Sequence, residues 1–133
     1  MSAKALAVAI RALAPSGVTK YDGQAPSGAA MPYLVVNQSV PDIDSRSEAS
    51  TPHGRVGQVL LTVAGATEDA VLGRLDVILP AFEGARPVVA GWNVSPLRQV
   101  GLVRVYPDST VTLPGGFPMV GKATFEYAVT RTP

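Results

Sequence analysis

The sequence contains no cysteine, so disulfide bonds and thiolate metal sites are excluded. The absence of cysteine suits a protein that folds in a reducing cytoplasm. Charged residues are scarce, at 16% of the chain, and eleven basic residues against ten acidic ones give a net charge of +1. No run of lysine and arginine provides the concentrated positive patch typical of nucleic-acid binding. So few charges for the surface of a free monomer indicate that a partner covers some apolar surface.

No apolar stretch approaches the length of about 20 residues that a helix needs to span a bilayer. The apolar N-terminal segment, residues 2–13, is short and is interrupted by Lys4 and Arg11. It is rich in alanine, the best helix former, and its larger apolar side chains fall on one helical face. We therefore expect a first helix here and no membrane partner.

The chain has enough apolar residues for one hydrophobic core. It is 133 residues long, close to the commonest domain size, and 47% of its residues are hydrophobic. No internal repeat and no linker divides it. We expect a single domain over residues 1–133.

Strand signals follow the first helix. Residues 18–21 predict a short strand, and the β-branched residues of 33–40 predict a longer one. Over residues 55–64, apolar side chains alternate with others, which predicts a third strand. Residues 41–54 are polar and aperiodic, which predicts a long loop that joins the two longer strands as an extended hairpin.

The clearest helical pattern covers residues 67–79. Thr67 is suited to cap this helix, and the two acidic residues that follow favour the positive end of the helix dipole. Pro80 and Gly84 are expected to end it. The spacing of three, four and seven residues predicts a buried stripe made of Val71, Leu72, Leu75, Ile78 and Leu79.

The last third of the chain predicts three more strands. They are expected at 87–90, at 97–106 with a bend at Gly101, and at 122–130, where apolar and polar residues alternate. Residues 107–121 predict a second long loop. The resulting order, α-β-β-β-α-β-β-β, predicts an α+β fold in which an antiparallel or mixed β-sheet carries two helices on one side.

Residues with catalytic or metal-binding chemistry are few. His53, the one histidine, lies among serines of the predicted loop, but catalysis needs a group to orient it and a nucleophile for it to activate. An exposed loop histidine is the simpler interpretation. Asp42, Asp44 and Glu48 lack the glycine and the terminal glutamate of an EF-hand calcium loop. We predict no enzymatic activity, no metal and no cofactor.

Other conspicuous residues are better explained as contacts or as structure. The glycine-rich residues 113–117 are followed by neither Lys-Ser nor Lys-Thr and precede a strand, so they do not form a phosphate-binding loop. Arg98 and Arg104 are possible ligand contacts, but solvated strand faces explain them better. Trp92 suits either the core or a partner contact. We predict that the two long loops contact other proteins through six residues, Asp42, Asp44, Arg46, Glu48, Leu113 and Phe117.

The order of several short motifs resembles one protein family. A short helix precedes residues 18–26, which read VTKYDGQAP, and a proline–tyrosine strand entry follows at 31–36, MPYLVV. After the polar segment come the strand VLLTV at 59–63 and the helix start GATEDA at 65–70. Over residues 1–82, this layout resembles the tail terminator, or tail completion, proteins of phages with long non-contractile tails, which are also called minor tail proteins.

The resemblance implies a structural role. Proteins of this family assemble as a hexameric ring that caps the growing tail tube, stops its polymerisation and presents a surface to the connector of the head. The partners implied are other copies of this chain, the tail tube protein and a head connector or neck protein, with DNA passing through the lumen without sequence-specific binding. The location implied is the virion tail or neck, and the host cytoplasm during assembly. No cofactor and no catalytic residue are implied.

Two other interpretations remain open from the sequence. Another head–tail connector or a minor capsid protein would share the fold and the lack of a catalytic site. A small ligand-binding domain or hydrolase would use His53 together with loop serines, and a fixed carboxylate beside His53 would support it.

Overall fold

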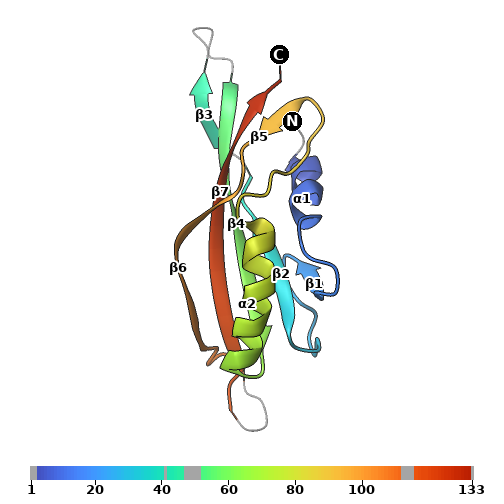
Figure 1. Ribbon diagram of the computed structural model, residues 1–133, viewed down its shortest axis with the longest axis vertical. Coiled ribbons are helices and arrows are strands. Elements are labelled where there is room, and N and C mark those ends of the chain that lie inside the picture. The colour runs from blue at the N-terminus through green and yellow to red at the C-terminus, as the bar shows by residue number, and fades with distance from the viewer. Residues whose placement is uncertain (1–2, 41, 47–51, 112–115, 133) are drawn as a thin grey trace.

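The computed structural model describes residues 3–40, 42–46, 52–111 and 116–132, with residues 42–46, 52 and 53 described by their backbone alone. These residues form two helices and seven strands (Figure 1). In chain order the elements are α1 (Ala3–Arg11), β1 (Lys20–Asp22), β2 (Tyr33–Gln38), β3 (Asp42–Arg46), β4 (Pro52–Gly65), α2 (Glu68–Phe82), β5 (Trp92–Val94), β6 (Arg98–Pro107) and β7 (Met119–Arg131). The predicted α+β fold, a mixed sheet with helices packed on it, is confirmed.

The sheet is built on its two longest strands, β4 and β7. They pair antiparallel from Gly54 opposite Thr130 to Gly65 opposite Met119. On its outer side β4 pairs first with β3 and then with β2, while β7 pairs first with β6 and then with β5. The short β1 adds to β2 in parallel and makes the sheet mixed. Each central strand therefore changes its partner midway along its length.

The core lies between the sheet and the two helices. Alternate residues of the central strands face it, with Val59 opposite Phe125 and Leu61 opposite Ala123. Helix α1 contributes Leu6 and Ile10, and the side-chain amide of Gln38 in β2 donates to a backbone carbonyl of α1. Helix α2 contributes the buried stripe Val71, Leu75, Ile78 and Phe82. Both helices consequently pack on the same face of the sheet.

Helix α2 begins as the sequence predicts and ends later. The Thr67 hydroxyl accepts from the backbone N–H of Ala70, which caps the first turn. The helix continues past the predicted end at residue 79 to Phe82, with Pro80 inside its last turn. A proline in the last turn removes one hydrogen bond to the preceding turn, and the packing of Phe82 in the core offsets that loss.

The prediction of a long loop over residues 41–54 is wrong for the residues that the structure describes. Residues 42–46 form strand β3, and β4 begins at Pro52 instead of Arg55, so the two strands pair as a hairpin. His53 consequently lies within β4 and not in a loop. Polar residues reveal such a strand poorly, because a strand with few apolar side chains has no hydrophobic alternation to detect.

Two boundaries in the last third also differ from the prediction. Residues 87–90 form only an isolated bridge, Val89 with Trp92, and the strand is β5, a few residues later. Strand β7 begins at Met119, inside the predicted loop 107–121. The bend at Gly101 is confirmed as a bulge, since Gly101 has a φ of 76° and the register shifts between residues 100 and 104.

Candidate functional site

The face of the sheet opposite the helices is partly exposed among the described residues, although Val35, Ala64 and Val120, also at outward positions, are buried. Its side chains come from the alternate positions of the strands that do not face the core. We call this surface the open face and define it by Val56, Gln58, Leu60, Thr62, Arg98, Val100, Arg104, Tyr106, Lys122, Thr124, Glu126 and Ala128.

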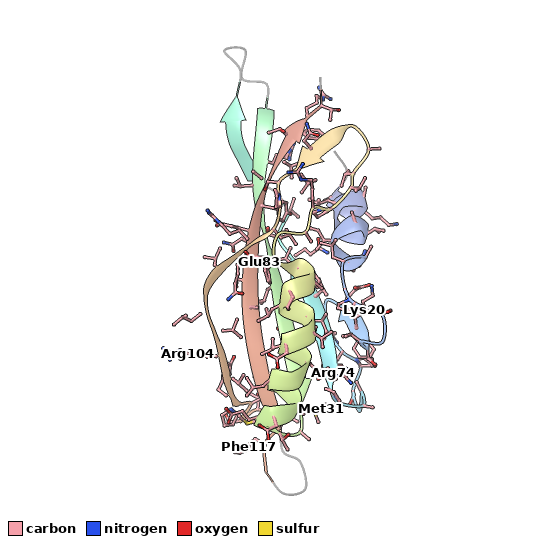
Figure 2. All side chains as sticks on the ribbon, viewed as in Figure 1. Lys20, Met31, Arg74, Glu83, Arg104 and Phe117 are labelled. Atoms are coloured by element: carbon pink, nitrogen blue, oxygen red, sulfur yellow. The ribbon has the colours of Figure 1, made fainter. Side chains whose placement is uncertain are left out.

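The open face carries apolar side chains in contact with solvent. Val56, Val100 and Tyr106 are each 41% exposed, and Leu102, in the bulge of β6, is 87% exposed. Arg104 lies on the same strand as Leu102, and its side chain extends away from β6 (Figure 2). A surface that mixes exposed apolar groups with arginine and tyrosine and holds few acids has the composition of a protein–protein interface.

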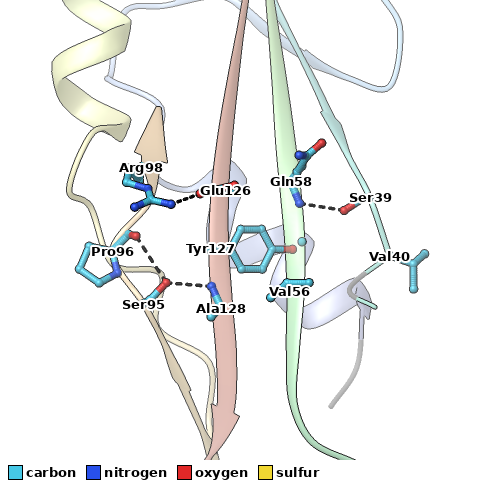
Figure 3. A pocket seen from close by; sticks show the side chains of 11 residues that line it. Ser39, Val40, Val56, Gln58, Ser95, Pro96, Arg98, Glu126, Tyr127 and Ala128 are labelled. Carbon is cyan, nitrogen blue, oxygen red and sulfur yellow. Dashed lines mark hydrogen bonds and ion pairs between the residues drawn. The ribbon is translucent and has the colours of Figure 1, made fainter. Parts of the chain in front are cut away.

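A hollow of about 620 Å³ lies on this face where the central strands change partners. Its floor comes from β4 and β7, and its two sides come from the connection between β2 and β3 and the connection between β5 and β6 (Figure 3). The lining residues are Ser39, Val40, Val56, Gly57, Gln58, Ser95, Pro96, Arg98, Glu126, Tyr127 and Ala128.

Two serines hold the sides of the hollow in the same way. The hydroxyl of Ser39 accepts from the backbone N–H of Gln58 at 2.9 Å, and that of Ser95 accepts from the backbone N–H of Ala128 at 2.8 Å (Figure 3). Each serine backbone N–H also donates to the carbonyl of the same strand residue. The two serines thus provide hydrogen bonds to backbone N–H and C=O groups of β4 and β7 at the positions where one partner strand has ended and the next has not begun.

One ion pair lies at the rim of the hollow. The guanidinium of Arg98 donates to the carboxylate of Glu126 across β6 and β7, and this hydrogen bond raises the pKa of Arg98 (Figure 3). Arg98, Glu126 and Tyr127 are the ionisable groups among the residues that line the hollow. The serine hydroxyls accept from backbone N–H groups, and the two charges at the rim are paired with each other, so these polar groups are satisfied within the protein.

Tyr127 crosses beneath the hollow on the core side of Gly57. The residue is 3% exposed, and its hydroxyl is one of two buried side-chain atoms without a hydrogen-bond partner among the described residues; the other is Nε of Arg55. Burial raises the pKa of Tyr127 to about 12, since it penalises the charged phenolate.

We expect Tyr127→Phe to raise the free energy of unfolding by about 1–3 kcal/mol at neutral pH, because it removes a buried hydroxyl that has no partner. Above pH 10 the difference in free energy of unfolding between the variant and the parent should increase. The unfolded tyrosine then loses its proton while the folded one holds it up to about pH 12, so the parent loses stability over that window and the variant does not. Chemical denaturation at pH 7 and at pH 11 measures both effects.

The exposed Tyr106→Phe is the control, because its hydroxyl is not buried and its removal should change neither value. A Tyr127→Phe variant that is less stable than the parent at pH 7 would show that the hydroxyl has a partner in solution.

The predicted contact residues do not gather at one place. Asp42, Asp44 and Arg46 lie in strand β3 and not in a loop, at one end of the molecule in Figure 1. Phe117 is 46% exposed at the opposite end, just before β7 (Figure 2). Glu48 and Leu113 lie outside the described residues.

Sequence reasoning missed most of the open face. Arg98 and Arg104 were recognised as exposed strand residues, and the structure places both on this face. Lys122, Gln58 and Val56, which also lie on this face, were not singled out. The alternation along residues 55–64 and 122–130 was the signal that could have identified this face. The inward positions of each strand form the core, and the outward positions between them necessarily form a shared surface. Trp92 is half-buried and stacks with the guanidinium of Arg131.

Among the described residues, no three histidine, aspartate or glutamate side chains gather closely enough to hold a metal ion. Neither α1 nor α2 has the length and apolar character needed to cross a membrane. The sequence matches no protein-family model and no curated protein.

Proposed function

We propose that this protein is a structural virion protein that caps the phage tail tube as a homo-oligomeric ring. In that role it ends tail polymerisation and provides the surface that joins tail to head. The observation that carries the proposal is the open face, which is a partly exposed sheet surface with solvent-exposed apolar side chains in a molecule that has a low content of charge. The sequence resemblance over residues 1–82 supports the same role.

A ring requires two different surfaces on each subunit, because its contacts run head to tail. A layer of helices on one side and a partly exposed sheet on the other supply two such surfaces. The hollow on the open face adds a place where a protruding side chain of a neighbour can insert. Its ionisable lining groups are an ion pair and a buried tyrosine, which favour binding over catalysis.

The proposal predicts that the protein shortens tail tubes. Added in increasing amounts to polymerising tail tube protein of the same phage, it should reduce the mean tube length seen by electron microscopy and appear as a ring at one tube end. Light scattering should give the mass of six chains for that ring. Folded protein that leaves tube length unchanged and binds a head connector instead would favour the alternative, another head–tail connector or a minor capsid protein.

A further inference from the structure

The solvent side of helix α2 forms a second contact surface. Its residues recur at spacings of three and four, on the side of the helix opposite the buried stripe. Two of its apolar side chains are exposed, Leu72 at 42% and Val77 at 48%. We call this surface the outer stripe, and its residues are Asp69, Leu72, Gly73, Asp76, Val77 and Pro80.

The outer stripe is acidic and flat along its middle. Asp69 and Asp76 are exposed, and neither forms an ion pair with another described residue. Between them lies Gly73, where nothing comes within 4 Å of the position of an added Cβ. Because Pro80 has no N–H, the carbonyl of Asp76 lacks its usual donor in the helix.

The open face carries the opposite charge. Arg104 and Lys122 are opposite each other on β6 and β7, both are exposed, and neither forms an ion pair within the described residues. Glu126 is already paired with Arg98. The carboxylate of Asp108, after β6, accepts from both the hydroxyl and the backbone N–H of Thr110, and these hydrogen bonds, with a smaller contribution from the charge of Lys122, lower the pKa of Asp108. Even with Asp108 counted beside Glu126, the acids are outnumbered by Arg98, Arg104 and Lys122, so the net charge of the open face is positive.

From this complementarity we infer that copies of this chain bind head to tail, with the outer stripe of one copy on the open face of the next. Two open faces brought together would oppose net positive charge with net positive charge, and two outer stripes would oppose aspartates with aspartates. A contact between unlike faces brings opposite net charges together, and it also covers the exposed apolar side chains on both surfaces.

The two surfaces lie on opposite sides of the molecule, since α2 packs on the core side of the sheet. A contact between them leaves one free surface of each kind at the two ends of the pair, so further copies can add. Such a heterologous contact closes into a ring when its rotation permits. The inference thus rests on the proposed function and supplies the contact between neighbouring subunits of the ring.

Two charge-reversed variants test the contact. The sheet variant carries Arg104→Glu and Lys122→Glu, and the helix variant carries Asp69→Lys and Asp76→Lys. In each variant both surfaces have the same sign, so self-association should weaken by about 100-fold or more, because like charges in an interface cost several kcal/mol. A mixture of the two variants should assemble again, because every sheet-variant surface then meets an oppositely charged surface of the helix variant.

The readout is molar mass by light scattering, at about 0.1 M salt, where charges interact over about 10 Å. Tail tubes are included if the parent assembles only on them. The control for the sheet variant is Lys4→Glu with Arg86→Glu, which makes the same change in net charge at exposed positions outside both surfaces. All four contact side chains are exposed, so the melting temperature of the sheet variant should stay close to that of the parent. The helix variant should melt slightly lower but remain folded, because Asp69→Lys places a positive charge in the first turn of α2.

The outcomes separate the inference from the proposed function. If the parent forms capping rings and both variants form them equally well, the inference is wrong and the proposed function stands. If each variant fails alone and the mixture also fails, the contact does not join these two faces. Variants that form rings but no longer bind the tube would assign the faces to the tube protein. A parent that neither assembles nor caps tubes would overturn the proposed function itself.

Discussion

Leu75→Ala is expected to lower the free energy of unfolding by about 2–5 kcal/mol. Leu75 is 4% exposed in the middle of the buried stripe of α2, and its Cδ1 atom lies 3.0 Å from the position that a Cβ on Gly121 would occupy. The backbone of β7 approaches the helix so closely there that α2 cannot sink further to fill the space left by the side chain. The lost burial and the remaining cavity therefore both contribute to the loss of stability.

Leu72→Ala is the matched control on the same helix. Leu72 is 42% exposed on the outer stripe, so its replacement should change the free energy of unfolding by less than about 0.5 kcal/mol. Denaturant unfolding of both variants measures the difference. Equal losses of stability would show that the two side chains are buried to the same degree in solution, and that the register of α2 on the sheet is wrong.

The comparison of these leucines shows how far the sequence predicts the fold. Periodicity identified Val71, Leu75 and Ile78 correctly as buried, because a helix on a sheet must bury one stripe. It also assigned Leu72 to that stripe, and the structure contradicts this, since Leu72 is exposed. A stripe about 100° wide includes residues at its margin, and only the position of the sheet decides which of them are covered.

The strands show where such prediction stops. Residues 55–64 and 122–130 alternate because one side of each faces the core, and both were found. Strand β3 was not, because it is held by backbone hydrogen bonds to the end of β4 and has little apolar pattern of its own. Pairing between segments distant from the core depends on backbone geometry, which residue types specify weakly.

The candidate site was harder to predict than the fold. No single residue of the open face is unusual, and its character comes from strands far apart in the sequence that lie side by side. Arg104 and Lys122 meet only because β6 pairs with β7, with a bulge at Gly101 that sets which residues are opposite each other. Sequence reasoning looked for contact residues in loops, whereas the pattern of unpaired charge lies on regular strands and on a helix.

Gly57→Ala is expected to destabilise the protein by about 1–3 kcal/mol or more. An added Cβ would lie 2.4 Å from the hydroxyl oxygen of Tyr127 and 2.6 Å from its Cζ atom. Tyr127 is almost fully buried and belongs to the core cluster, so turning its ring away from Gly57 would disturb the packing of its neighbours. Either the ring or the backbone of β4 must move, and thermal melting should record the loss.

Two further variants establish that the cause is this contact. Gly73→Ala, where no atom lies within 4 Å of the added Cβ, should instead stabilise helix α2 by about 0.5–1 kcal/mol. Tyr127→Leu removes the ring and its hydroxyl, which are the atoms that the added Cβ would meet, so in that background Gly57→Ala should lose most of its effect. Because the two residues touch, a double-mutant cycle measures their coupling directly. If Gly57→Ala destabilises both backgrounds equally, the ring does not lie over Gly57 in solution, and the floor of the hollow must be built differently.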